Sequence, residues 1–115
     1  MPGAHTPIMA RQMVEAMAPR DGRTYVDGTF GAGGYSEALL RAALCTVWGI
    51  DRDPGVVATG ADLERRHGGR FKILAGRYGD MVPLLAGADV TQVDGIALDL
   101  GLSSMQIDDA ERGFS

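Results

Sequence analysis

The sequence places three glycines, Gly31, Gly33 and Gly34, between an apolar segment and a segment with helical character. A dinucleotide-binding fingerprint reads G-x-G-x-x-G, and here Ser36 stands at the third glycine position. Such a loop lets the backbone approach a ligand closely, and the following helix points its N-terminus at a carboxylate or phosphate. The alternative is a tight turn that needs positive φ, for which one glycine suffices. Three glycines within four residues favour a ligand-binding loop.

Acidic residues near the loop indicate which ligand it would bind. Asp27, just before the glycines, disfavours a pyrophosphate and favours a cation or polar amine, unless it serves only the turn or a helix cap. S-adenosylmethionine, with an ammonium, a sulfonium and a single carboxylate, suits this position. Asp51 lies 20 residues after Gly31, where an acid accepts hydrogen bonds from ribose hydroxyls. Asp53 is expected to cap the helix that Pro54 begins.

Two later segments add further candidates. Tyr78 either stacks on an adenine ring or packs at the rim of the site. Asp80 either reaches the adenine amine or caps the helix after it. Asp99 ends an apolar strand that needs no charge for folding, so we expect its carboxylate to face the crevice where a transferred group would lie. Neutral hydrogen-bonding groups follow at Ser103, Ser104 and Gln106.

The elements that must position these residues alternate along the chain. The pattern predicts short apolar strands over residues 24–28, 46–51, 70–74 and 93–100. It predicts helices that start at Thr6-Pro7 and end before Pro19, and then over 36–44, 54–67 and 81–85. Alternating strands and helices indicate an α/β fold with a doubly wound, Rossmann-like parallel sheet in the order three, two, one, four. Ligands of such sheets bind beyond the carboxyl ends of the strands.

Composition limits the classes of function. The chain has 115 residues, a formal net charge of -4 and a single cysteine, Cys45. The sequence has no cluster of basic residues, so most of the positive charge that would bind a nucleic acid must lie outside this chain. The lone cysteine fits a reduced, cytoplasmic setting. No apolar run reaches transmembrane length and no signal peptide is recognisable, so we expect no membrane association.

Four segments resemble one enzyme family: "HTPIM", "YVDGTFGAGGYSEALL", "GIDRDP" and "DGIALDLGLSSMQIDDAERGFS". They are similar to the bacterial ribosomal RNA small-subunit methyltransferase H family, also called MraW. The resemblance implies a class I methyltransferase fold, S-adenosylmethionine as cofactor, and methylation of N4 of a cytidine in 16S ribosomal RNA of the small subunit. It assigns no metal. It implies cofactor contacts from Gly33, Gly34, Tyr35, Asp51, Tyr78, Asp99 and Gln106.

The chain departs from the family pattern at three of these positions or beside them. The family usually has histidine at Tyr35, phenylalanine at Tyr78 and proline at Met105. Tyr78 keeps an aromatic face for stacking, and Tyr35 is expected to contribute mainly its backbone. Met105 removes a rigid turn beside Gln106.

The resemblance also implies that residues 1–115 are the N-terminal, cofactor-binding part of a longer enzyme. Later strands and a helical insert that holds the RNA would lie outside this chain, so we expect the chain alone to be inactive. Strand 93–100 would then be an unguarded sheet edge, prone to self-association.

Two residues, Asp99 and His5, each have two alternative roles. Asp99 is the best candidate to accept a hydrogen bond from the cytosine amine, or it instead holds the methionine ammonium. His5 either flanks the pocket or merely neighbours a helix cap. Outside methyl transfer, the rivals are a nicotinamide-dependent oxidoreductase domain, with which Asp51 agrees equally well, and a fragment that binds cofactor without catalysing a reaction.

Overall fold

The computed structural model describes residues 8–99. Its helices are α1 (Ile8–Met17), α2 (Gly34–Ala42), α3 (Val57–Arg66) and α4 (Met81–Gly87), with short 3-10 turns η2 (Pro54–Val56) and η3 (Tyr78–Asp80). Its strands are β1 (Thr24–Asp27), β2 (Thr46–Asp51), β3 (Phe71–Ala75) and β4 (Gly95–Ala97).

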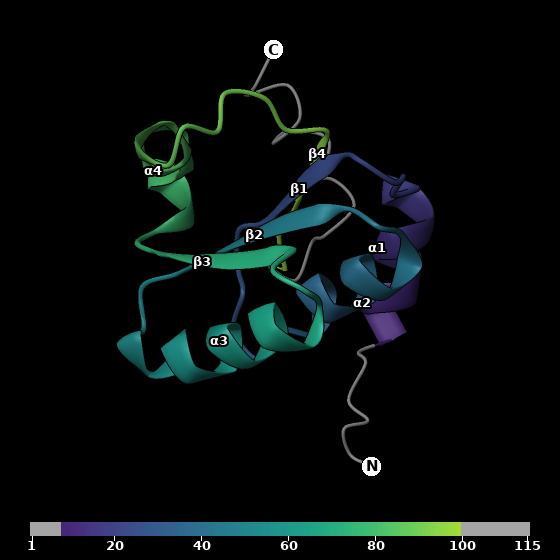
Figure 1. Ribbon diagram of the computed structural model, residues 1–115, viewed down its shortest axis with the longest axis horizontal. Coiled ribbons are helices and arrows are strands. Elements are labelled where there is room, and N and C mark those ends of the chain that lie inside the picture. The colour runs from purple at the N-terminus through teal and green to yellow at the C-terminus, as the bar shows by residue number, and fades with distance from the viewer. Residues whose placement is uncertain (1–7, 100–115) are drawn as a thin grey trace.

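The four strands form one parallel sheet in the order β3-β2-β1-β4. This confirms the predicted order and the α/β Rossmann-like class. Helices α1, α2 and α3 cover one face of the sheet and α4 lies on the other (Figure 1). The carboxyl ends of β1, β2 and β3 meet at one edge, because Asp27 is in register with Gly49 and Asp51 with Ala75.

Each face of the sheet has its own apolar core, because successive strand residues point to opposite faces. Tyr25 packs with the helices α1 to α3, whereas its neighbour Val26 packs toward α4. The first core contains Leu39, Leu63 and Phe71, and the second contains Ile50 and Leu85 among others. Strands that are buried on both faces explain why the sequence shows continuous apolar runs and not strict alternation.

Element boundaries differ from the predictions by a few residues, and the differences around α2 and α3 bear on the site. Helix α2 begins at Gly34, not at residue 36, because Gly33 already takes the N-cap position with a φ of 88°. The segment from Pro54 first forms the turn η2, and α3 then ends at Arg66 before the expected glycines, Gly68 and Gly69, at φ of 62° and 84°.

Strand β4 is shorter than the predicted 93–100. At its start the Asp94 carboxylate accepts a hydrogen bond from the Thr24 N–H at 2.9 Å. At its end the Asp99 N–H donates to the Thr29 hydroxyl at 2.7 Å. Side chains thus take part in the contacts at both ends, although the Asp94 N–H also donates to the Thr24 carbonyl at 2.7 Å. Leu100 lies outside the described residues.

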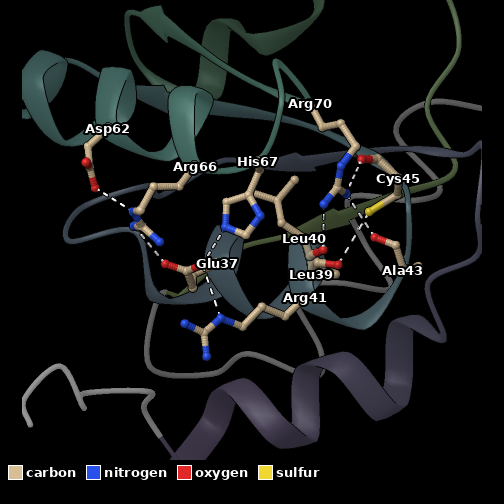
Figure 2. A network of polar contacts seen from close by, with 10 residues as sticks. All are labelled: Glu37, Leu39, Leu40, Arg41, Ala43, Cys45, Asp62, Arg66, His67 and Arg70. Carbon is tan, nitrogen blue, oxygen red and sulfur yellow. Dashed lines mark hydrogen bonds and ion pairs between the residues drawn. The ribbon is translucent and has the colours of Figure 1, made fainter.

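A polar network ties α2 to α3 and to the start of β3 (Figure 2). Glu37 of α2 bonds Arg66 at 2.9 Å and His67 at 2.6 Å, both at the end of α3. Burial by itself raises the pKa of Glu37, but the hydrogen bonds from Arg66 and His67 outweigh it and leave the pKa below its ordinary value. Arg70 donates to the carbonyls of Leu40, Ala43 and Cys45 at 3.0 to 3.2 Å. The network fixes α2, whose N-terminus carries the glycine loop.

Within residues 8–99, no helix combines the length and the apolar character needed to cross a membrane.

Candidate cofactor site

The glycine loop joins β1 to α2 with a backbone that needs glycine. Gly31 and Gly33 have φ of 52° and 88°, in the left-handed region that favours glycine. The Gly33 carbonyl accepts from the Glu37 N–H at 2.9 Å, which closes the first turn of α2. A Cβ on Gly33 would also meet the Phe30 ring at 3.1 Å. The conformation of the turn therefore requires glycine at these positions by itself. Ligand binding by the loop stays a prediction.

Asp27 is buried within the turn, in contrast to the ligand-facing position expected from sequence. The residue is 0% exposed. Its carboxylate accepts hydrogen bonds from the Ser36 hydroxyl at 2.7 Å and the Thr29 N–H at 3.3 Å. Burial is the main cause that raises the pKa of Asp27 from 3.8 to about 6. The alternative holds: Asp27 serves the turn, by linking the end of β1 to the first turn of α2.

Asp51, at the end of β2, connects that strand to the glycine loop. One carboxylate oxygen accepts from the Gly31 N–H at 2.9 Å and the other from the Asp53 N–H at 2.8 Å. A carboxylate has about four lone-pair sites, so both oxygens can accept further hydrogen bonds from a ligand. Asp53 accepts from the Gly55 N–H at 2.8 Å, which confirms its predicted capping role.

A cavity of about 420 Å³ opens at the carboxyl ends of β1, β2 and β3. Asp51 and Tyr78, two of the residues expected to bind adenosine, both line it. Tyr78 is 43% exposed, so part of its surface is open to a ligand. The cavity lining also includes Gly28, Gly31, Arg52 and Arg77. The structure thus brings together residues from the ends of three strands, as the sheet topology predicts.

Asp80 does not form the capping hydrogen bond expected of its side chain. It takes the N-cap position of α4, but its side chain makes no capping hydrogen bond there. Its backbone N–H instead donates to the Arg77 carbonyl at 2.9 Å within η3. Asp80 is also not among the residues that line the cavity.

Asp99 lies two residues beyond β4, beside the cavity but not in its lining. Its exposed side chain is held at this edge by the bond from its own N–H to Thr29, which does line the cavity. Tyr35 lies behind the glycine loop in the second position of α2, with its side chain buried in the core. Several expected residues lie outside the described part of the chain: His5, Ser103, Ser104, Met105 and Gln106.

Sequence reasoning did not single out three polar residues of the cavity lining, Thr29, Arg52 and Arg77. Arg52 and Arg77 follow the ends of β2 and β3, so the rule that located Asp51 would have found them. Thr29 follows the end of β1 in the same way, but the role of its hydroxyl, which accepts from the Asp99 N–H, appears only when β4 lies beside β1.

Comparisons with known proteins agree with this geometry. The model of the MraW methylase family matches residues 3–115. Similar curated proteins are named ribosomal RNA small subunit methyltransferase H. The one from Rhodospirillum centenum is 59% identical over 99% of this chain and 35% of its own length. The one from Paramagnetospirillum magneticum is 57% identical over 99% of this chain and 36% of its own length. The one from Acidiphilium cryptum is 49% identical over 97% of this chain and 36% of its own length.

This chain therefore spans about a third of the length of these curated relatives. The family match extends over almost all of the chain and includes the glycine loop, Asp51, Tyr78 and Asp99. It agrees with the resemblance seen in the sequence, and we conclude that the chain belongs to the MraW methylase family.

Proposed function

We propose that this chain is the S-adenosylmethionine-binding part of an enzyme that methylates N4 of a cytidine in 16S ribosomal RNA. The observation that carries the proposal is the cavity beyond β1, β2 and β3, where Asp51 and Tyr78 lie next to the glycine loop. Family membership supports methyl transfer as the reaction class.

The residues of the cavity fit an adenosine-bearing methyl donor. The volume of about 420 Å³ falls within the range of roughly 300–1,000 Å³ that is usual for small-molecule sites. Tyr78 offers an aromatic face for the adenine, and the free lone pairs of Asp51 accept from the ribose hydroxyls. Gly33 and Gly34 place the N-terminus of α2 where it can bind the single carboxylate of the donor. Gln106 completes the proposed set from outside the described residues.

In the proposed methyl transfer, the main task of the protein is to position the two reacting groups. When bound, S-adenosylmethionine supplies an electrophilic methyl group on its sulfonium. The N4 lone pair of cytosine is delocalised into the ring, so the amine must be held in line with that methyl group. Positioning of this kind is worth roughly 7–11 kcal/mol. Asp99, exposed beside Thr29, is our candidate to accept a hydrogen bond from the amine and increase its electron density.

RNA binding is assigned mainly to other parts of the longer protein. The chain carries a net charge of -4, and only two arginines, Arg52 and Arg77, line the described cavity. A polyanion needs more positive charge than that. We therefore propose that residues 1–115 bind the cofactor but do not methylate RNA by themselves, and that the whole protein acts on the small ribosomal subunit in the cytoplasm.

The case against a nicotinamide-dependent domain loses one argument and gains another. Asp27 was expected to repel a pyrophosphate, but its carboxylate is buried against Ser36, so its charge discriminates poorly between ligands. Ser36 at the third glycine position and the methylase family match still disfavour a dinucleotide.

Calorimetric titration of the purified chain with S-adenosylmethionine and, separately, with NAD tests the proposal. We expect saturable binding of S-adenosylmethionine and none of NAD. Binding of NAD without S-adenosylmethionine would refute the cofactor assignment. A parallel assay with labelled S-adenosylmethionine and small ribosomal subunits should show no methyl transfer by the chain alone. Transfer there would refute the division of roles.

A further inference from the structure

Two arginines line the cavity, and binding of S-adenosylmethionine does not explain them. Arg52 directly follows β2, and Arg77 lies two residues beyond β3. The ends of these strands are joined, because Asp51 is in register with Ala75 and the Gly76 N–H donates to the Asp51 carbonyl at 3.0 Å. The fold therefore brings both arginines to the same part of the cavity lining.

The chain neutralises neither guanidinium within residues 8–99. Arg52 and Arg77 are exposed, and no ion pair or side-chain hydrogen bond between described residues involves them. Most of the other basic side chains in this range have a carboxylate or carbonyl partner: Arg23, Arg41, Arg65, Arg66, Arg70 and Lys72. Each of the two cavity arginines thus offers all of its N–H donors to a ligand.

The charge of the cavity lining is opposite in sign to that of the chain. Its charged side chains are one carboxylate and two guanidiniums, whereas the whole chain has a net charge of -4. The carboxylate, Asp51, already accepts from the Gly31 and Asp53 N–H groups. An excess of positive charge at an open cavity attracts an anion. The methyl donor does not supply one here, because its single carboxylate is assigned to the N-terminus of α2 and its other charges are positive.

The RNA substrate brings the required anion, since every nucleotide of its backbone carries a phosphate. Guanidinium groups bind phosphate oxygens through paired, charge-assisted hydrogen bonds. We propose that Arg52 and Arg77 together bind a backbone phosphate of the substrate RNA at the rim of the cofactor cavity. This inference rests on the proposed function and deepens it, because it assigns a contact with the RNA to the cofactor-binding part of the enzyme.

The sheet order places this contact away from the reacting amine. Asp99 follows β4, which lies two strands from β2 and three from β3. At a spacing of about 4.8 Å between strands, roughly 10–14 Å separate the arginines from that end of the edge. The bound phosphate therefore positions the RNA strand across the mouth of the cavity and leaves most of the affinity to the rest of the longer protein.

Binding of a short RNA to the chain tests the inference. The probe is a labelled single-stranded oligoribonucleotide with a central cytidine, titrated at low salt in saturating S-adenosylhomocysteine and followed by fluorescence anisotropy. We expect the double variant Arg52→Gln, Arg77→Gln to weaken RNA binding by roughly tenfold or more, since hydrogen bonds to a charged group are lost. The slope of log K against log salt concentration should become shallower by about 0.7 for each lost phosphate contact. Calorimetry should show an unchanged affinity for S-adenosylhomocysteine.

The matched control is the double variant Arg11→Gln, Arg20→Gln. Both residues are exposed, form no ion pair within the described part of the chain and lie outside the cavity lining. The two double variants remove the same positive charge, so a general electrostatic effect would weaken RNA binding equally in both. We expect the control to retain most of the RNA binding.

Three results would overturn the phosphate assignment while the cofactor site stands. They are an equal loss of RNA affinity in both double variants, no RNA binding by the unmodified chain, and a loss of S-adenosylhomocysteine affinity on removal of Arg52 and Arg77. The last result would place these arginines on the cofactor. If the unmodified chain binds no S-adenosylhomocysteine, the proposed function itself fails and the inference falls with it. Melting temperatures check folding, and the single variants Arg52→Gln and Arg77→Gln give the same comparison if the double variant does not fold.

Discussion

Two aspartates at the ends of neighbouring strands show how burial decides the role of a residue. Asp27 and Asp51 both follow apolar strands, and their types alone suggest similar tasks. The fold buries Asp27 completely against Ser36 and leaves Asp51 partly exposed in the cavity lining. Sequence could locate both at the functional edge. It could not tell which carboxylate turns inward, because that depends on the contact with Ser36 nine residues later.

The buried carboxyl group makes a prediction about pH. The pKa of Asp27 is higher in the folded state, about 6, than the 3.8 expected when unfolded. The folded state then binds the proton more tightly, so this contribution to stability is present below about pH 4 and is lost as the pH rises through 6. The difference amounts to about 3 kcal/mol.

Asp27→Asn keeps a neutral side chain at every pH. Its amide oxygen can accept from the Thr29 N–H and its NH2 group can donate to the Ser36 oxygen. We expect the variant to be more stable than the unmodified chain at pH 7.5 and about equal to it at pH 4, as measured by urea denaturation. A stability difference that does not change between these two pH values would contradict the raised pKa.

Asp51 and Asp53 allow a matched comparison of a ligand-binding residue with a capping residue. Asp51→Ala should weaken S-adenosylmethionine binding by about 1.5–3 kcal/mol, because charge-assisted hydrogen bonds to the ribose are lost. Asp53→Ala should instead lower the stability of the chain by about 1 kcal/mol through the lost cap. Calorimetric titrations and melting curves on both variants separate the effects. Equal losses of affinity would mean that the ribose lies elsewhere.

At the level of elements, local signals predicted which helices and strands exist, and long-range contacts set where they end. The period of the apolar residues and the glycines after α3 are local, and the predicted order of strands is confirmed. The predicted limits of β4 were wrong: only Gly95–Ala97 pairs with β1, and on either side of it Asp94 and Asp99 contact Thr24 and Thr29, 70 residues away in the chain. No pattern within the strand itself contains that information.

Arg70 is a second example of a long-range contact, and it leads to a prediction. Its guanidinium donates to three carbonyls at the end of α2 and in the segment that follows it, 25 to 30 residues earlier in the chain. The last carbonyls of a helix need such partners. Arg70→Ala should therefore lower the free energy of unfolding by about 2 kcal/mol, because partly buried acceptors lose their donor.

Two further variants define the cause of this effect. Arg70→Lys should recover only part of the loss, since an ammonium lacks the planar fork that reaches all three carbonyls. Arg65→Ala, at a side chain that is 71% exposed and pairs with Asp62, should change stability by no more than about 0.5 kcal/mol. Urea denaturation measures all three variants. Equal stability of Arg70→Ala and Arg65→Ala would show that the carbonyl contacts contribute little.

For the whole molecule, the sheet order leaves β4 with one neighbour. It pairs with β1 on one side, and in the described part of the chain nothing pairs with the other side. Its residues Ile96 and Ala97 are buried within the core. Asp94, just before its start, already accepts hydrogen bonds from Thr24 and Arg23. An edge strand without its own charge, proline or bulge is a template for pairing with another chain.

We therefore expect the purified 115-residue chain to self-associate through β4, with the weight-average mass in sedimentation experiments rising as the protein concentration increases. Gln92→Lys places a charge on an exposed residue just before this edge and should shift the distribution toward monomer. Val57→Lys makes the same change of charge on an exposed residue of α3, away from the edge, and should leave the association unchanged. The comparison separates edge pairing from a general electrostatic effect, because both variants change the net charge of the chain from -4 to about -3. A monomer at every concentration would show that the edge of β4 is protected, and an equal response to both lysines would place the association at another surface.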